Sequence, residues 1–184
     1  MRRRGNAALF WPVLLVVLVA DVITKAIAER ALLPRGIPRE VMGDYVRLNL
    51  VYNPGAAWGL HVGPHSRWIF GVLTVVALAI LARLLLITRE GDTPRVVALG
   101  LVCAGAVGNL IDRVRSIFGV VDFIDLGIND TTRFPTFNVA DIAVSVGATL
   151  LAWVLWREDR AAQAVVSPVV VPASASGGEP GDLA

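Results

Sequence analysis

Four long runs of apolar residues dominate the sequence and predict four membrane-spanning helices. Each run approaches the roughly 20 residues that a helix needs to cross a bilayer. The predicted spans cover about residues 8–28, 68–87, 96–114 and 137–156. Between the first two spans, partial alternation over residues 45–52 predicts a short strand, and Asn53-Pro-Gly55 after it is typical of a turn. The pattern therefore predicts an all-α membrane protein whose first 160 residues form one domain.

The end of the chain, residues 161–184, has a different character. It is rich in Ala, Val, Pro, Ser and Gly and shows no periodic pattern that could bury a core. We expect this segment to be a disordered tail on the cytoplasmic side.

Composition supports a membrane protein and excludes several kinds of site. Of the 184 residues, 55% are hydrophobic and 17% are charged, below the roughly 25% of soluble domains. The net charge of +2 gives no indication of a nucleic-acid partner. The single cysteine, Cys103, excludes an internal disulfide and a thiolate metal cluster, and we expect it to pack inside the third span. His61 and His65 lie in a loop with Gly and Pro that is typical of solvated histidines, so we expect neither a metal nor a cofactor.

Basic residues indicate how the chain crosses the membrane. They gather before the first span, between the second and third spans, and after the fourth: Arg2, Arg3, Arg4, Arg89, Arg95, Arg157 and Arg160. The positive-inside rule then places both termini in the cytoplasm, although arginines in the outer loops weaken the bias. The first span also has features of a cleavable signal peptide, ending in Ala26-Ile-Ala28. Asp21 and Lys25 would interrupt such a peptide, so we favour its retention as a helix.

Polar residues inside and beside the spans share one depth. At 1.5 Å per residue, Asp21 and Asn109 lie roughly 20 Å from the cytoplasmic ends of the first and third spans. Asp141 lies about 6 Å from the outer end of the fourth span, which runs the other way. The complete set at this level is Asp21, Lys25, Asn109, Asp112, Asp122 and Asp141. Scattered structural polar groups would have no reason to share a depth, so the pattern indicates one site near the outer face.

Spacing along two of the helices supports this convergence. Asp21 and Lys25 are four residues apart and can pair on one helix face. Asn109, Asp112 and Arg113 also lie on one face of their helix. Each set could equally be a neutralised ion pair that orders the bundle.

Two aspartates have surroundings that an ion pair does not explain. Asp122 and Asp141 are embedded in apolar sequence with no lysine among their near neighbours. A carboxylate there is costly to ionise, and two of them can share one proton, which is the arrangement of an aspartic hydrolase.

Other function classes explain less of the pattern. A small proton- or cation-coupled transporter would use Asp21, Asp122 and Asp141 as relay groups. It predicts polar groups across the full membrane depth, whereas the cytoplasmic halves of the spans carry only Arg83. A scaffold held by ion pairs leaves the apolar surroundings of the two aspartates unexplained. The sequence contains neither a Gly-x-Ser-x-Gly elbow nor a Gly-x-Gly-Asp motif.

Five motifs, taken in order, resemble those of the lipoprotein signal peptidase (signal peptidase II) family. They are Asp21-Val-Ile-Thr-Lys25, Asn53-Pro-Gly-Ala-Ala-Trp-Gly59, Gly108-Asn-Leu-Ile-Asp-Arg113, Val121-Asp-Phe123 and Phe137-Asn-Val-Ala-Asp141. The resemblance covers about residues 8–157, and the last three motifs together are the most specific. One small departure is Trp58, where the family more often has Phe.

The resemblance implies a fold, an activity and roles for individual residues. It implies a catalytic dyad of Asp122 and Asp141 and a small extracytoplasmic β-rich cradle, which agrees with the strand predicted at 45–52. Substrate-binding or site-bracing positions are implied for Asn53, Asn109, Asp112, Arg113, Asn138, Asp21 and Lys25. The implied enzyme is a bacterial plasma-membrane aspartic endopeptidase that removes signal peptides from diacylglyceryl-modified prolipoproteins, on the amino side of the lipidated cysteine. Its expected partners are these substrates and membrane lipids, with no nucleic acid, and we expect a monomer.

Overall fold

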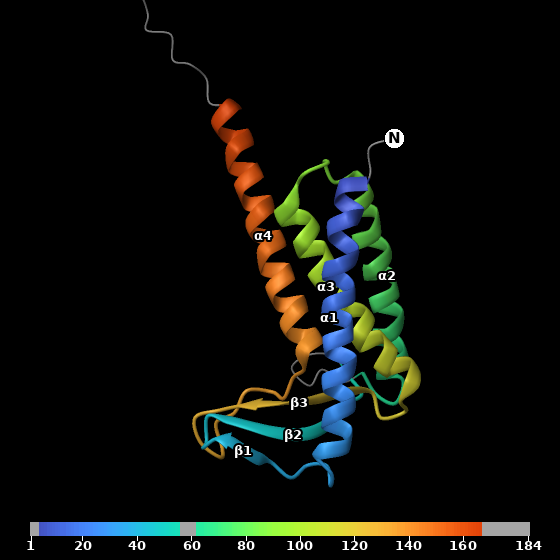
Figure 1. Ribbon diagram of the computed structural model, residues 1–184, viewed down its shortest axis with the longest axis vertical. Helices are drawn as coiled ribbons and strands as arrows, with labels where there is room; N and C mark the ends of the chain where they lie inside the picture. Colours follow the sequence, from blue (N-terminus) through green and yellow to red (C-terminus); the bar gives the residue numbers. More distant parts are fainter. Residues whose placement is uncertain (1–3, 56–61, 167–184) are drawn as a thin grey trace, which may run out of the picture.

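The computed structural model describes residues 4–55 and 62–166, which form four long helices and a small antiparallel sheet (Figure 1). The helices are α1 (Arg4–Ala31), α2 (Ser66–Ile87), α3 (Thr93–Arg115) and α4 (Val139–Val166). The strands are β1 (Arg39–Met42), β2 (Val46–Asn53) and β3 (Val120–Leu126). All four helices are long and apolar enough to cross a membrane, so the predicted fold class is confirmed.

The fourth helix is longer than the sequence predicts. It continues to Val166, so residues 161–166 belong to a helix and not to the expected tail. Alanine, arginine, glutamate and glutamine make up most of residues 157–166, and these residue types have high helix propensity. The Gln163 side chain also donates a hydrogen bond to Asp159, four residues earlier, at 2.7 Å. Residues 167–184, the rest of the expected tail, lie outside the described residues.

Helix α3 lies at the centre of the bundle. Half of its most apolar 18-residue stretch is buried, against 6–22% in the other three helices, whose apolar side chains face outward. Glycines on α3 and α4 allow close packing of the two backbones. A Cβ atom at Gly105 would overlap the Ala140 carbonyl oxygen, and one at Gly147 would lie 2.9 Å from the Ala98 carbonyl oxygen.

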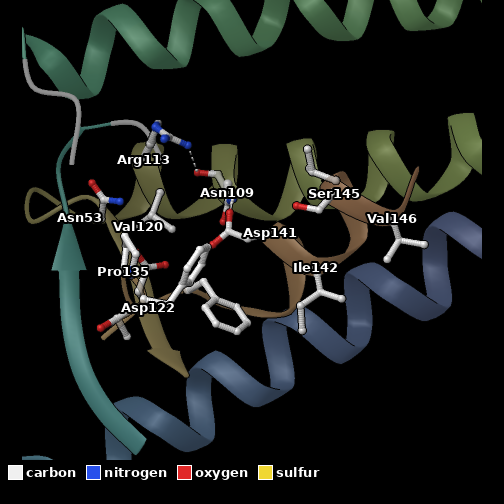
Figure 2. Close-up of a pocket in the computed structure, with 14 residues that line it drawn as sticks. Asn53, Asn109, Arg113, Val120, Asp122, Pro135, Asp141, Ile142, Ser145 and Val146 are labelled. Atoms are coloured by element: carbon white, nitrogen blue, oxygen red, sulfur yellow. Dashed lines mark hydrogen bonds between the residues drawn. The ribbon is translucent and has the colours of Figure 1, made fainter. Parts of the chain in front are cut away.

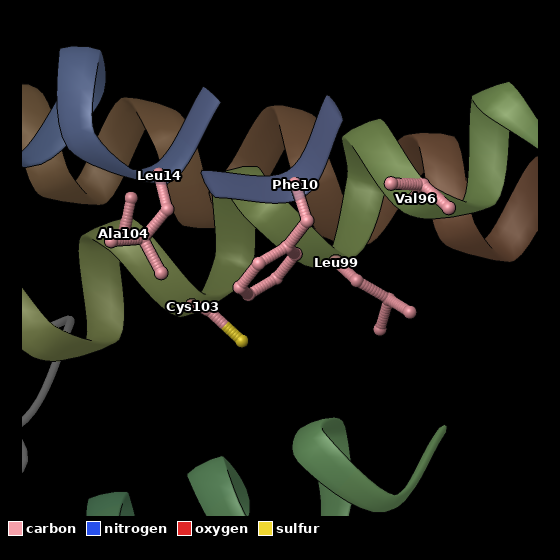
Figure 3. Packing of buried hydrophobic residues seen from close by; sticks show 6 residues of the cluster. All are labelled: Phe10, Leu14, Val96, Leu99, Cys103 and Ala104. Atoms are coloured by element: carbon pink, nitrogen blue, oxygen red, sulfur yellow. The ribbon is translucent and has the colours of Figure 1, made fainter. Parts of the chain in front are cut away.

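An apolar cluster packs the first half of α1 against α3 (Figure 3), toward the end of the bundle away from the sheet (Figure 1). It consists of Phe10, Leu14, Val96, Leu99, Cys103 and Ala104. Cys103 is a buried packing residue, as predicted. The described stretches of the helices on this side of the bundle, residues 5–20, 66–87, 93–108 and 142–157, contain no Asp or Glu.

The sheet lies at the opposite end of the bundle from the start of α1 and the end of α4 (Figure 1). Its strand order is β1-β2-β3, with both pairs antiparallel. Strand β2 confirms the strand predicted at 45–52, whereas β1 and β3 were not predicted from the pattern. Asp122, expected just beyond the third helix, lies inside β3 and pairs in register with Val51.

One face of the sheet packs against the end of α1. Leu50, Val121 and Phe123 form a buried cluster with Ala28 and Leu32. Side chains alternate between the two faces of a strand, so this packing turns Asp122 away from α1 and toward α3 and α4. The sheet thereby sets the direction of one of the two candidate catalytic groups.

Candidate active site

A cavity of about 440 Å³ lies between β3, α3 and the first turns of α4. Five residues that the sequence analysis singled out line it: Asn53, Asn109, Arg113, Asp122 and Asp141. Figure 2 shows these side chains converging from β2, α3, β3 and α4 on one space. Of the six residues predicted to share one depth, Asn109, Asp122 and Asp141 line this cavity, whereas Asp21, Lys25 and Asp112 do not.

Asp141 lies in the first turn of α4 and takes part in its N-terminal cap. The Asp141 backbone N–H donates to Asn138 Oδ1 at 2.9 Å, and the Asn138 backbone N–H donates to Asp141 Oδ2 at 3.1 Å. This reciprocal pair is a capping box, which satisfies two backbone donors at a helix start. The other carboxylate oxygen, Oδ1, accepts from Asn109 Nδ2 at 2.8 Å. Asp141 is thus held from its own helix and from α3.

Asp122 is held by the same asparagine. Asn138 Nδ2 donates to Asp122 Oδ1 at 2.7 Å, and Asn53 also hydrogen-bonds the Asp122 side chain. Asp122 is only 3% exposed. Burial first, and then the charge of Asp141, raise the pKa of Asp122 to about 7. Asn138 therefore contacts both aspartates, and Asp122 loses its proton at a higher pH than an ordinary aspartate does.

Behind the cavity lies a buried charged cluster centred on Lys25. The Lys25 ammonium lies 2.8 Å from Asp21 Oδ2 and 2.8 Å from Asp112 Oδ2, and it donates to Asn109 Oδ1 at 2.8 Å. Lys25 is 2% exposed and Asp21 is fully buried. The pairing of Asp21 with Lys25 predicted from their spacing is present, and Asp112 joins it as a second carboxylate.

Each acid of this cluster accepts a backbone hydrogen bond next to one of the candidate catalytic residues. Asp21 Oδ1 accepts from the N–H of Ala140 at 2.9 Å, immediately before Asp141. Asp112 Oδ2 accepts from the N–H of Val121 at 3.3 Å, immediately before Asp122. The charged cluster thus connects α1 and α3 to both elements that carry the two aspartates.

Arg113 shapes the opposite wall of the cavity. Its guanidinium donates to the Gly55 carbonyl at 2.9 Å and to the Asn109 carbonyl at 3.2 Å. Asp112, the preceding residue in the sequence, faces Lys25 and not this wall, because adjacent helix positions point about 100° apart. Trp58 and His61, named in the sequence analysis, lie outside the described residues.

Several residues of the cavity were not found from the sequence. Ile142, Ser145 and Val146 follow Asp141 on the same helix by one, four and five residues, so the sequence contained a signal that could have identified them. The segment 134–137 carries no such signal. It reaches the cavity because Phe137 pairs with Ile124 of β3, with two backbone hydrogen bonds of 2.8 and 3.0 Å. Among the described residues, no group of three His, Cys, Asp or Glu side chains is arranged to hold a metal ion.

Comparisons with known proteins identify a family and solved structures of similar fold. A family model described as signal peptidase (SPase) II matches residues 13–157. The lipoprotein signal peptidase of Pseudomonas fluorescens is 39% identical over 158 residues, covering 84% of this chain and 92% of that protein. The lipoprotein signal peptidase of Halothermothrix orenii is 38% identical over 149 residues, covering 80% and 94%. A solved bacterial membrane enzyme superposes with a TM-score of 0.73 at 31% identity, covering 82% of this chain and 88% of that one.

Proposed function

The chain belongs to the signal peptidase II family, and we propose that it is an aspartic endopeptidase acting on diacylglyceryl-modified prolipoproteins. In this proposal it removes the signal peptide by cutting on the amino side of the lipidated cysteine. The observation that carries the proposal is the pair of aspartates, Asp122 and Asp141, which line one cavity and share Asn138.

The surroundings of the two aspartates suggest different roles for them. Both carboxyls accept two hydrogen bonds, but only that of Asp141 lies in the first turn of α4, where the positive end of the helix dipole suits the ionised partner. Asp122 is more deeply buried, and its raised pKa suits the protonated partner. We assign Asp141 as the general base and Asp122 as the general acid.

The proposed reaction is a hydrolysis with two proton transfers. Asp141 takes a proton from water while the water oxygen attacks the scissile carbonyl carbon, and Asp122 donates its proton to the carbonyl oxygen. In the second step Asp141 gives its proton to the leaving nitrogen, and the C–N bond breaks. Asp122 recovers its proton as the carbonyl reforms, so both residues end as they began.

The position of the cavity fits a lipidated substrate. The cavity lies at the sheet end of the bundle, and the wall made by α4 is apolar at Ile142 and Val146. Acyl chains and the hydrophobic part of a signal peptide can remain in the bilayer while the scissile bond reaches the two aspartates. We propose that the sheet end faces outward in the bacterial plasma membrane, with both termini in the cytoplasm and a monomer as the active unit.

The decisive experiment compares cleavage of diacylglyceryl-modified and unmodified prolipoprotein by the purified protein. Only the modified substrate should be cleaved. Asp122→Asn and Asp141→Asn should each abolish cleavage, and the double variant should be scarcely worse, because members of one catalytic unit are not additive.

Asp92→Asn is the matched control for these variants. Asp92 caps α3 through the Arg95 N–H at the opposite end of the bundle, and Asn is an equally good capping residue. Full activity in either single dyad variant would remove that residue from the mechanism. Equal cleavage of both substrates would reject the proposed specificity for lipidated proteins.

A further inference from the structure

One hydroxyl group in the described helices has no hydrogen-bond partner among the described residues. Thr24, Thr74, Thr88 and Thr149 each donate to the backbone carbonyl four residues earlier, at 2.7–2.8 Å. Ser66 and Thr93 bond to nearby carbonyls as well. Within the described parts of α1 to α4, the Ser145 hydroxyl is the exception. It is also the one hydroxyl of these helices that lines the cavity.

Ser145 lies one helical turn beyond Asp141, on the same side of α4 (Figure 2). Four residues along a helix correspond to about 6 Å, so the hydroxyl lies that much further from the sheet than the dyad. The lining residues around it, Ile142, Val144 and Val146, are aliphatic. The Ser145 side chain is exposed at the cavity, so a bound molecule can reach its hydroxyl, and a molecule that displaces water there must satisfy that hydroxyl.

A peptide substrate brings a particular kind of polar group to this place. A signal-peptide helix must end before its scissile bond can enter the dyad in extended form. The last four carbonyl groups of a helix have no partner within it, whereas the N–H groups of its last turn are satisfied. The ester groups of diacylglycerol also present carbonyl oxygens. Both sources therefore offer acceptors and need a donor, and a serine hydroxyl can donate.

We propose that the Ser145 hydroxyl donates a hydrogen bond to a carbonyl oxygen of the bound substrate and so contributes to substrate selection. This inference rests on the proposed peptidase function and adds a binding residue to it. The contact lies away from the reacting atoms and is made equally in the substrate complex and the transition state. Losing it should therefore raise KM and leave kcat unchanged. A single neutral hydrogen bond corresponds to a rise in KM of about three- to tenfold.

The test measures KM and kcat for Ser145→Ala on diacylglyceryl prolipoprotein. Alanine is a good helix former, so the helix should be retained. Thr149→Val is the matched control, because it removes a hydroxyl one turn further along α4 and outside the cavity. We expect a three- to tenfold higher KM for Ser145→Ala with kcat within twofold, and no change beyond twofold for Thr149→Val.

A second substrate with ether-linked alkyl chains identifies the acceptor. If the effect of Ser145→Ala disappears on this substrate, the partner is a lipid ester carbonyl; if it persists, the partner is a signal-peptide carbonyl. An unchanged KM in Ser145→Ala, or an equal rise in Thr149→Val, would overturn the inference while cleavage by the unsubstituted protein still supports the peptidase function. Absence of cleavage by the unsubstituted protein would reject the peptidase function and this inference with it.

Discussion

Replacing Lys25 with Met should destabilise the protein strongly, because it leaves two buried carboxylates without their counterion. Lys25 lies 2.8 Å from both Asp21 and Asp112, and the side chains of the three residues are at most 4% exposed. Removing one partner of a buried ion pair costs about 3–5 kcal/mol. For a chain of this length, each kcal/mol lowers Tm by about 2–4 °C, so we expect a fall of roughly 6–20 °C.

Neutralising the two acids should restore stability in steps. Asp21→Asn and Asp112→Asn each keep an oxygen that can accept the hydrogen bond from Ala140 or Val121. Adding Asp21→Asn to Lys25→Met leaves one buried charge, and adding Asp112→Asn as well leaves none. The double variant should therefore recover part of the lost Tm, and the triple variant most of it.

Thermal unfolding in mild detergent, followed by tryptophan fluorescence, measures these differences. Arg95→Met is the matched control, because Arg95 also contacts two carboxylates, those of Asp92 and Glu158. Arg95 is 20% exposed, and partly exposed pairs contribute only about 0–1 kcal/mol. An equal fall in Tm for Lys25→Met and Arg95→Met, or no recovery in the triple variant, would refute the reasoning.

Three further predictions concern the cavity and its packing. Activity against pH should be bell-shaped with an alkaline limb near pH 7, because the pKa of Asp122 is about 7 and the active form carries one proton; a pH–rate profile that keeps rising at alkaline pH would contradict this. The folded-state pKa of Asp122 lies above its unfolded value of 3.8, so the free energy of unfolding should fall as pH rises from about 4 to 7. In Asp122→Asn, unfolding measured over the same pH range should show a smaller fall. Gly108→Ala should lower stability by about 1–3 kcal/mol because its Cβ would overlap Asp21 Oδ2, whereas Gly71→Ala, with its nearest neighbour at 4.0 Å, should leave stability unchanged or raise it by up to about 1 kcal/mol.

The spans and the depth of the site could be predicted because both follow from position along a helix. An apolar run fixes where a helix crosses, and 1.5 Å per residue then fixes the level of Asp21, Asn109 and Asp141. The pairing of Asp21 with Lys25 follows from the same geometry. The helix positions and the Asp21–Lys25 pair each depend on a single helix, and both are present in the folded structure.

Contacts between distant segments could not be predicted in the same way. Nothing in the sequence around Asn138 shows that one amide contacts both Asp122 and Asp141, since this depends on β3 lying beside the start of α4. Strand β1 is short and fully exposed, so it carries no burial pattern to detect. The place of Asp112 beside Lys25 depends on the packing of α3 against α1, which spacing on a single helix does not determine.

The cap at the start of α4 has a consequence for the nascent protein. Asp141 acquires its geometry only when Asn138 begins the helix, and Ala140 is held there by Asp21 of α1 while Asn109 of α3 contacts Asp141 itself. A partly inserted chain that lacks any of these helices has no assembled dyad. Under the proposed function, proteolytic competence therefore arises only after α4, the last of these helices in the sequence, has packed against α1 and α3.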